Sequence, residues 1–92
     1  MSEGAEKVKI DRKIILQKTI EILSKFLNIK TDEIKTATRL KEDLGVESVD
    51  VLDIALELER EFEIDIGDYE ATWVVTIQDM TDLIAKKMGG ET

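Results

Sequence analysis

Apolar residues recur at helical spacing in three long stretches of the chain, and polar segments separate these stretches. The first stretch contains a broad apolar stripe made by Ile15, Leu16, Thr19, Ile20, Ile22, Leu23, Phe26 and Leu27. Asp11 is a suitable N-cap before this stripe, and Asn28 stands where the helix should stop. The pattern therefore predicts a first helix over about 11–27.

A long connection follows, over 29–40, without sustained periodicity. Thr31 to Ile34 resembles one short capped turn, and we expect Ile34 and Leu40 to place apolar side chains beneath the loop. Gly45 then supplies a flexible turn.

The second helix is predicted to begin near Ser48, which can serve as its N-cap, and to end near Phe62. Two apolar stripes run along it. We assign the first to the core; it contains Val51, Ala55, Leu58 and Phe62. The second is offset to one side and contains Val49, Leu52 and Leu56. Periodicity alone favours a bundle that wraps this helix on both sides; the alternative is that the second stripe meets a partner.

The last part of the chain predicts one short and one longer helix. The short one covers about 68–73, with Tyr69 and Trp73 one turn apart. The longer one starts at Thr76, whose spacing to Asp79 is close to a capping box, and ends at Gly89-Gly90. No strand pattern is present. We therefore predict an all-α fold, a small antiparallel bundle of three main helices and one short helix.

Composition removes several classes of function. The 92 residues include no cysteine and no histidine, so the chain offers no thiolate or imidazole for catalysis, and no metal site or catalytic residue is expected. The net charge of −8 argues against nucleic acid and anionic membranes as partners. Residues 41–70 hold twelve acidic and two basic side chains, which favours basic partners. No apolar run reaches membrane-spanning length and 1–9 lacks a secretion signal, so we expect a cytoplasmic monomer without stable membrane insertion.

Ser48 is the one side chain whose position suggests a chemical role. A serine at a helix start is most often only a cap. The N-terminus of a helix also favours negative charge, so a phosphodiester on this serine would be compatible with the capping role.

The segment Asp43-Leu44-Gly45-Val46-Glu47-Ser48-Val49-Asp50 resembles the Asp-Leu-Gly-x-Asp-Ser-Leu-Asp signature of acyl carrier proteins. The likeness continues in register through 58–62 and on to 75–79, and it covers about 11–88. This resemblance implies that Ser48 is esterified to 4′-phosphopantetheine, which a phosphopantetheinyl transferase takes from coenzyme A. The thiol of that arm would carry acyl groups as thioesters.

The resemblance also implies two further sets of residues. The partner-docking set contains Glu47, Val49, Asp50, Leu52, Asp53, Leu56, Glu57, Glu59 and Arg60. The set that would line an acyl pocket between helices contains Val51, Ala55, Leu58 and Phe62. Partners would be acyl-loading and acyl-transferring enzymes with basic patches, as in fatty-acid, lipid or polyketide-type synthesis.

Four positions depart from the family pattern. Glu47 replaces the usual aspartate, Val49 replaces leucine, and Arg60 stands where an acid is usual. Trp73 stands where a polar residue is common; we expect it to cover the edge of the core beside the short helix, with a partner contact as the alternative. These departures favour a specialised carrier over the general carrier of fatty acid synthesis.

Two other functions are left open by the sequence. One is a carrier of aminoacyl or peptidyl groups, and the other is an unmodified helical interaction module that has kept the carrier fold. Either would have the same domain organisation: a flexible segment 1–9, a carrier domain 10–88 and a flexible tail 89–92.

Overall fold

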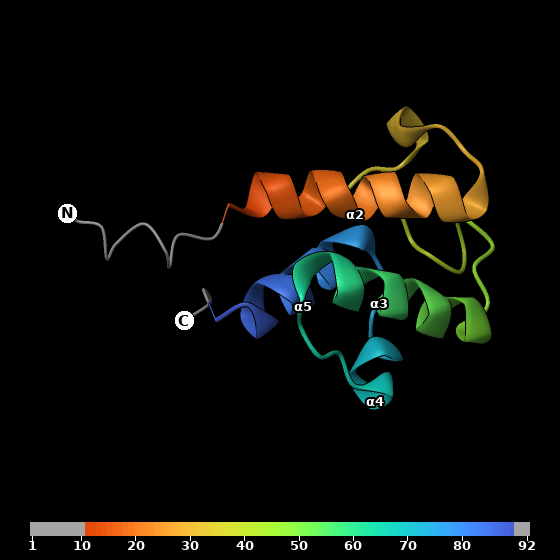
Figure 1. Ribbon diagram of the computed structural model, residues 1–92. Coiled ribbons are helices and arrows are strands. Elements are labelled where there is room, and N and C mark those ends of the chain that lie inside the picture. Colours follow the sequence, from red (N-terminus) through yellow and green to blue (C-terminus); the bar gives the residue numbers. More distant parts are fainter. Residues whose placement is uncertain (1–10, 90–92) are drawn as a thin grey trace.

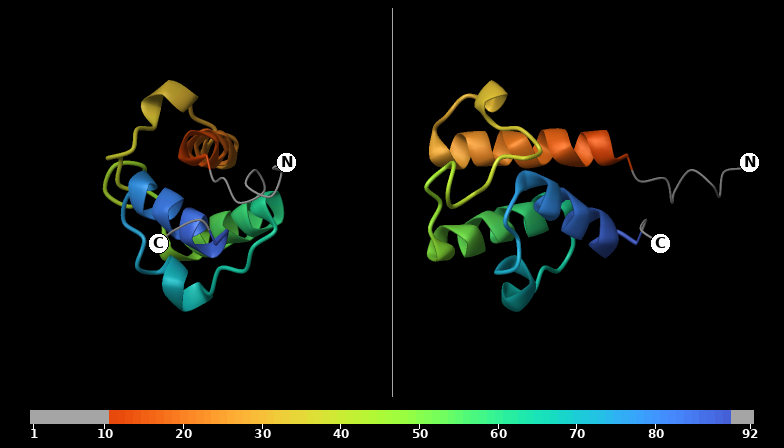
Figure 2. Two further views of the ribbon diagram at one scale, coloured as in Figure 1. Left: turned by 90° about the vertical axis from the view of Figure 1, so that its left-hand side faces the viewer. Right: turned by 180° about the vertical axis from the view of Figure 1, so that it is seen from behind.

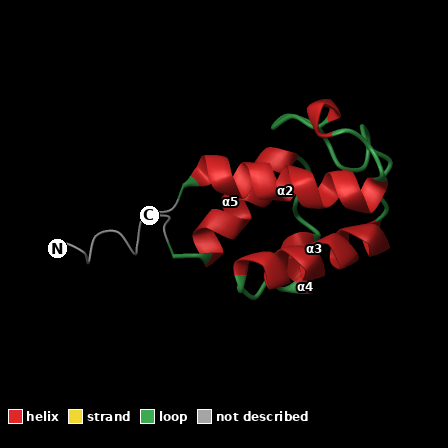
Figure 3. Cartoon of the chain, turned by 45° about the horizontal axis from the view of Figure 1, so that its top comes forward, coloured by secondary structure: helices red, strands yellow, loops and turns green. Residues whose placement is uncertain are grey.

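The computed structural model describes residues 11–89, which form a helical bundle (Figure 1). Its elements are α2 (Arg12–Leu27), the 3-10 helix η1 (Thr31–Glu33), α3 (Ser48–Phe62), α4 (Asp68–Ala71) and α5 (Ile77–Lys87). α3 runs back beneath α2, α5 packs against α2, and α4 lies beyond α3 (Figure 2). Helices and loops make up the described part of the chain, without a strand (Figure 3). The predicted all-α bundle is confirmed.

The first helix has the predicted ends. The Asp11 carboxylate accepts the N–H of Lys13 at 3.0 Å and caps α2. Asn28 ends it in the left-handed conformation with φ 58°, and its N–H donates to the carbonyl of Ser24. Asparagine is one of the few residues that tolerate this conformation, so the helix stops where the sequence predicts. The predicted segment 1–9, and 90–92 of the predicted tail, lie outside the described residues.

The buried face of α2 is narrower than the predicted stripe. Ile15, Thr19 and Leu23 are buried, whereas Ile22 is half-buried and Phe26 is exposed. Residues four apart lie on one face of a helix, so these three buried residues form one row, and α2 packs against α5 and α3. Phe26, a member of the predicted stripe, is exposed and lines an open groove with Glu57 and Arg60 of α3.

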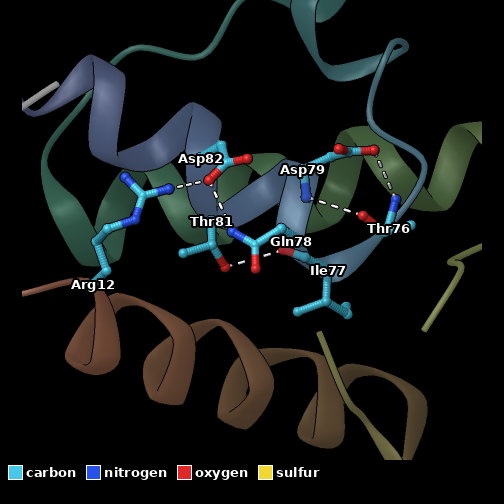
Figure 4. A network of polar contacts seen from close by, with 7 residues as sticks. All are labelled: Arg12, Thr76, Ile77, Gln78, Asp79, Thr81 and Asp82. Atoms are coloured by element: carbon cyan, nitrogen blue, oxygen red, sulfur yellow. Dashed lines mark hydrogen bonds and ion pairs between the residues drawn. The ribbon is translucent and has the colours of Figure 1, made fainter. Parts of the chain in front are cut away.

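Polar contacts fix the start of α5 and link this helix to α2 (Figure 4). The Thr76 hydroxyl accepts the N–H of Asp79 at 3.1 Å, and the Asp79 carboxylate accepts the N–H of Thr76 at 3.1 Å. This is the predicted capping box. Farther along α5, Asp82 accepts from the side chain of Gln78 and forms an ion pair with Arg12 at the start of α2.

Backbone hydrogen bonds join the long connection between α2 and α3 to the start of α5. Ile34 and Leu40 are buried, as predicted. The N–H of Leu40 donates to the carbonyl of Val75 at 2.9 Å, and the N–H of Ile77 donates to the carbonyl of Thr38 at 3.0 Å. These bonds satisfy backbone groups that a loop under the bundle would otherwise leave unpaired. The loop is therefore a fixed support for the segment that follows it.

The short helix differs from its prediction. α4 ends at Ala71 rather than Trp73. Beyond it the N–H of Trp73 donates to Glu70 and that of Val74 to Ala71, a tight turn that leaves Val74 buried. Trp73 is consequently 68% exposed, so the prediction that it covers the core was wrong.

Candidate functional site

The segment before α3 is a turn closed by one arginine and one aspartate. The Asp43 carboxylate accepts the backbone N–H of Arg39 at 2.8 Å and contacts its guanidinium at 3.1 Å and 3.4 Å. This hydrogen bonding lowers the pKa of Asp43 below its ordinary value. The N–H groups of Asp43 and Leu44 both donate to the carbonyl of Arg39. The aspartate of the predicted motif thus holds the turn in shape.

Two buried side chains anchor the same turn to the core. Leu40 precedes the turn, Val46 follows it, and both side chains are almost fully buried. The N–H of Val46 donates to the carbonyl of Leu40 at 2.9 Å. Between them Gly45 adopts φ +71°, a left-handed conformation that residues with a Cβ rarely take. The turn therefore delivers the chain to the first residue of α3 in one orientation.

Ser48 is exposed and is the first residue of α3. The prediction that Ser48 caps this helix was wrong: Glu47 is the N-cap, and its N–H donates to the Asp50 carboxylate at 3.1 Å. The aspartate three residues on fulfils the capping function, because a carboxylate there reaches back to the N-cap. Within residues 11–89 the Ser48 hydroxyl has no hydrogen-bond partner, so its oxygen is available for chemistry.

The electrostatic setting of Ser48 is mixed. The first N–H groups of α3 have no acceptor inside the helix and give its N-terminus a partial positive charge. Lys41 adds a full positive charge, since it lines the same small hollow as Ser48. Glu47 and Asp50 add negative charges beside it. The helix end and Lys41 together favour a singly charged anion on the serine.

The hollow beside Ser48 has a volume of about 20 Å³, enough for about one water molecule. Its walls come from the turn, α3 and the end of α4, and contain Lys41, Ser48, Val51, Ala71, Thr72 and Val74.

Only Val51 of the predicted acyl-pocket set lines the hollow. Ala55 and Leu58 are buried deeper in the core, and Phe62 is half-buried in a groove with Ile14 and Met88 at the far end of α3. The acyl-lining role of this set stays a prediction.

The second apolar stripe of α3 faces outward. Val49 is 60% exposed and Leu56 is 50% exposed, while Leu52 between them is half-buried. The interpretation that the bundle wraps α3 on both sides was wrong, because α2, α4 and α5 leave this side uncovered. An apolar row exposed along a helix is typical of a surface that meets another molecule.

The acids of α3 divide into two groups. Asp53 and Glu57 are exposed beside the apolar row. Asp50 and Glu59 are engaged within the chain: Asp50 caps the helix, and the Glu59 carboxylate accepts the N–H of Ile66 at 2.6 Å. The predicted docking role of this second pair stays a prediction, but their structural role was not foreseen.

The basic member of the predicted docking set is also engaged within the chain. The Arg60 guanidinium lies 3.2 Å from the Glu57 carboxylate, one turn earlier in α3, and both side chains remain mostly exposed. A surface pair of this kind adds little stability and stays open to exchange with charges on another protein.

Sequence reasoning missed several residues that shape the site. Ile54 is completely buried and lies at helical spacing from Val51 and Leu58, so the same periodicity could have found it. Lys41, Thr72 and the other distant walls of the hollow carry no local signal, since only the fold brings them to Ser48.

Known proteins match both the sequence and the fold. The family model described as the phosphopantetheine attachment site matches residues 17–84. The acyl carrier protein of Chlorobium phaeobacteroides is 34% identical over 73 residues, which is 79% of this chain and 94% of that protein. The acyl carrier protein of Prochlorococcus marinus is 35% identical over 75 residues, 82% of this chain and 94% of the relative.

Solved structures of similar proteins agree. The acyl carrier protein of Enterococcus faecalis, studied for its high thermal stability, superposes with a TM-score of 0.71 at 32% identity, over 85% of this chain and 99% of the other. The crystal structure of an acyl carrier protein from Thermotoga maritima gives a TM-score of 0.74 at 31% identity, over 85% and 91% of the two chains. Within residues 11–89, none of the helices combines the length and apolarity that crossing a membrane requires.

Proposed function

Because the chain belongs to the acyl carrier protein family, we propose that Ser48 is the residue to which its prosthetic arm is attached. The family makes the chain a carrier of acyl groups rather than an enzyme, with covalent 4′-phosphopantetheine as its cofactor. The observation that carries the assignment to Ser48 is its position as an exposed serine with a free hydroxyl at the start of α3.

The surroundings of Ser48 fit the group. A phosphodiester on this oxygen would lie beside the unpaired N–H groups at the start of α3 and on the same side as Lys41, which lines the hollow with Ser48. The arm supplies a terminal thiol for thioester chemistry, which a chain without cysteine cannot provide itself. The chain contributes the fixed turn that presents the serine.

The exposed side of α3 supports a docking role. Val49 and Leu56 provide the apolar centre, and Asp53 and Glu57 provide charge at its border. We propose that this surface binds the transferase and the acyl-handling enzymes through their basic patches. Exposed charge pairs raise the rate of encounter more than the affinity, so these complexes should be brief and weakened by salt.

Two exposed departures from the family pattern support a specialised carrier. Arg60 places a positive charge within the acidic face of α3, and Trp73 places a large aromatic ring on the surface. Both would alter which partners fit. A carrier dedicated to one pathway is the finer proposal, and the cytoplasm is proposed as its location.

The assignment of Ser48 is tested by intact mass. The purified chain is incubated with coenzyme A and a broad-specificity phosphopantetheinyl transferase, together with Ser48→Ala and the control Ser24→Ala. Ser24 is the other serine of the described residues, and its hydroxyl bonds to the carbonyl of Ile29. A gain of one phosphopantetheinyl group in the wild type and in Ser24→Ala, absent in Ser48→Ala, is expected.

The proposal is overturned if Ser48→Ala is still modified. It is also overturned if neither that transferase nor those of the source genome modify the wild type, in which case the chain would be an unmodified interaction module. For the modified protein, transfer of amino acids rather than acyl groups to the arm would indicate an aminoacyl carrier.

A further inference from the structure

α4 and the turn after it display two aromatic side chains to solvent. Tyr69 is 74% exposed and Trp73 is 68% exposed. Their ring centroids lie 5.9 Å apart at an interplanar angle of 79°, an edge-to-face pair. They include the only tryptophan and the only tyrosine of the chain. Large aromatic rings left open to water in a small domain are candidates for contact with another molecule.

The backbone that carries this pair is held in place. The Glu70 carboxylate, between the two rings in sequence, lies 2.8 Å from the Lys87 ammonium of α5 and accepts the N–H of Gly67 at 3.0 Å. Ala71 is completely buried, and the Thr72 hydroxyl donates to the carbonyl of Tyr69 at 2.6 Å. The aromatic pair is therefore presented on a fixed platform, which lowers the entropy lost when a partner binds.

The unpaired charges on the segment that carries the pair are negative. Between Arg60 and Lys86 the sequence has seven acidic residues and no basic residue. Asp65 and Asp68 are exposed, and neither side chain forms an ion pair or hydrogen bond within residues 11–89. Three of the seven acids, Glu61, Glu70 and Asp82, are ion-paired with Lys18, Lys87 and Arg12. Asp65 and Asp68 are therefore the unpaired charges nearest to the rings in the sequence, and both are negative.

These features select among possible occupants. Nucleic acid and anionic membranes are repelled by the unpaired carboxylates of Asp65 and Asp68 and by the net charge of −8, and a second copy of the chain would bring the same charges together. A cation is attracted both by the carboxylates and by the faces of the rings. An arginine side chain suits both, because its planar guanidinium stacks on aromatic rings while it binds carboxylates.

We propose that Tyr69 and Trp73 form an arginine-binding surface, the aromatic docking site, which receives an arginine of an enzyme that acts on the carrier. This inference rests on the proposed function, because it takes the partner to be such an enzyme. Thr72 lines the hollow beside Ser48, so this site begins next to the proposed attachment point. The two rings belong to α4 and the turn after it, whereas the apolar row of Val49 and Leu56 belongs to α3.

The test uses the unmodified full chain and three synthetic peptides. Each peptide carries two arginines, two lysines or two citrullines separated by glycines; citrulline keeps the shape of arginine without its charge. Binding is followed by two-dimensional NMR of the backbone amides of 68–73. The variants are the double replacement Tyr69→Leu with Trp73→Leu, and the control Val75→Ala, which shortens an exposed apolar side chain nearby.

The wild type should bind the arginine peptide about two- to fivefold more tightly than the lysine peptide, and the citrulline peptide more weakly than either. The double leucine variant should lose this preference, and Val75→Ala should keep it. Four outcomes would each overturn the inference. The two cationic peptides could bind equally tightly, or the leucine variant could retain the preference for arginine. The NMR shifts could be confined to segments other than 68–73, or no peptide could bind. The mass test of Ser48 is independent of the peptide titration. If Ser48 is not modified but the arginine peptide binds as expected, only the proposed function is overturned. If Ser48 is modified but the peptide preference is absent, only the aromatic docking site is overturned.

Discussion

Replacing Gly45 by alanine isolates the cost of the turn that presents Ser48. Gly45 has φ +71°, and a Cβ built there meets no atom within 4 Å. The added methyl group therefore causes no clash, and its whole cost is conformational. Forcing an alanine into the left-handed region costs about 1–2 kcal/mol. The reduced freedom of the unfolded chain offsets about 0.4–1 kcal/mol of this.

The expected net loss is about 1 kcal/mol in the free energy of unfolding, measured by urea denaturation followed by far-UV circular dichroism. Gly45→Asn should lose less, because asparagine tolerates the left-handed region. Gly67→Ala is a control for the sign of φ: Gly67 has an ordinary φ of −70°, and its added Cβ would displace the flexible Glu70 carboxylate, 3.3 Å away, by a few tenths of an ångström.

Three outcomes would contradict this reasoning. A loss well above 2 kcal/mol in Gly45→Ala would mean that the methyl group does collide with the structure. No loss would mean that the turn adopts another conformation in solution. A loss in Gly45→Asn as large as that in Gly45→Ala would mean that the cost has a cause other than the sign of φ.

Three further predictions concern α3 and the turn before it. Leu58→Ala should reduce the free energy of unfolding by about 2–5 kcal/mol because this side chain is completely buried. Leu56→Ala, at a half-exposed position, should change it by less than about 0.5 kcal/mol. Equal losses of the two variants in urea denaturation would refute the burial pattern. Leu56→Ala should nevertheless slow the modification of the chain by the transferase, measured as kcat/KM, and an unchanged value would remove Leu56 from the docking surface. Hydrogen bonding to Arg39 lowers the pKa of Asp43, so the unfolded chain binds this proton more readily, and stability should fall as the pH drops from 3.8, the ordinary value, through the lower folded pKa. In thermal melts, Asp43→Asn should weaken this loss of stability at low pH. The control Asp53→Asn, at a residue outside any ion pair of residues 11–89, should retain it.

Local patterns determined the parts of the fold that the sequence predicted correctly. The ends of α2 depend on Asp11 and Asn28, and the start of α5 depends on Thr76 and Asp79, so each can be predicted from side chains a few residues apart. The position of Ser48 at the start of α3 followed from a motif held in register. These features need no knowledge of what the helix packs against.

Tertiary packing decided the parts that the sequence predicted wrongly. Trp73 was expected to cover the edge of the core, and Phe26 belongs to the predicted apolar stripe of α2, yet the bundle leaves both side chains exposed. Which side of a helix is covered depends on where its neighbours lie, and 92 residues bury too thin a core to cover every apolar stripe. The hollow beside Ser48 was missed for the same reason, because Thr72 and Val74 reach it from another element.

The acids of α3 show why charge alone cannot identify a docking surface. Asp50 and Glu59 look like free acids in the sequence, but each accepts a backbone N–H that the fold would otherwise leave unpaired. A carboxylate used in this way is already oriented by the chain, and turning it toward a partner would break that bond. Asp53 has no such contact within residues 11–89, and Glu57 has only an exposed pair. Their charges remain available for long-range attraction of a basic enzyme at no cost to the fold.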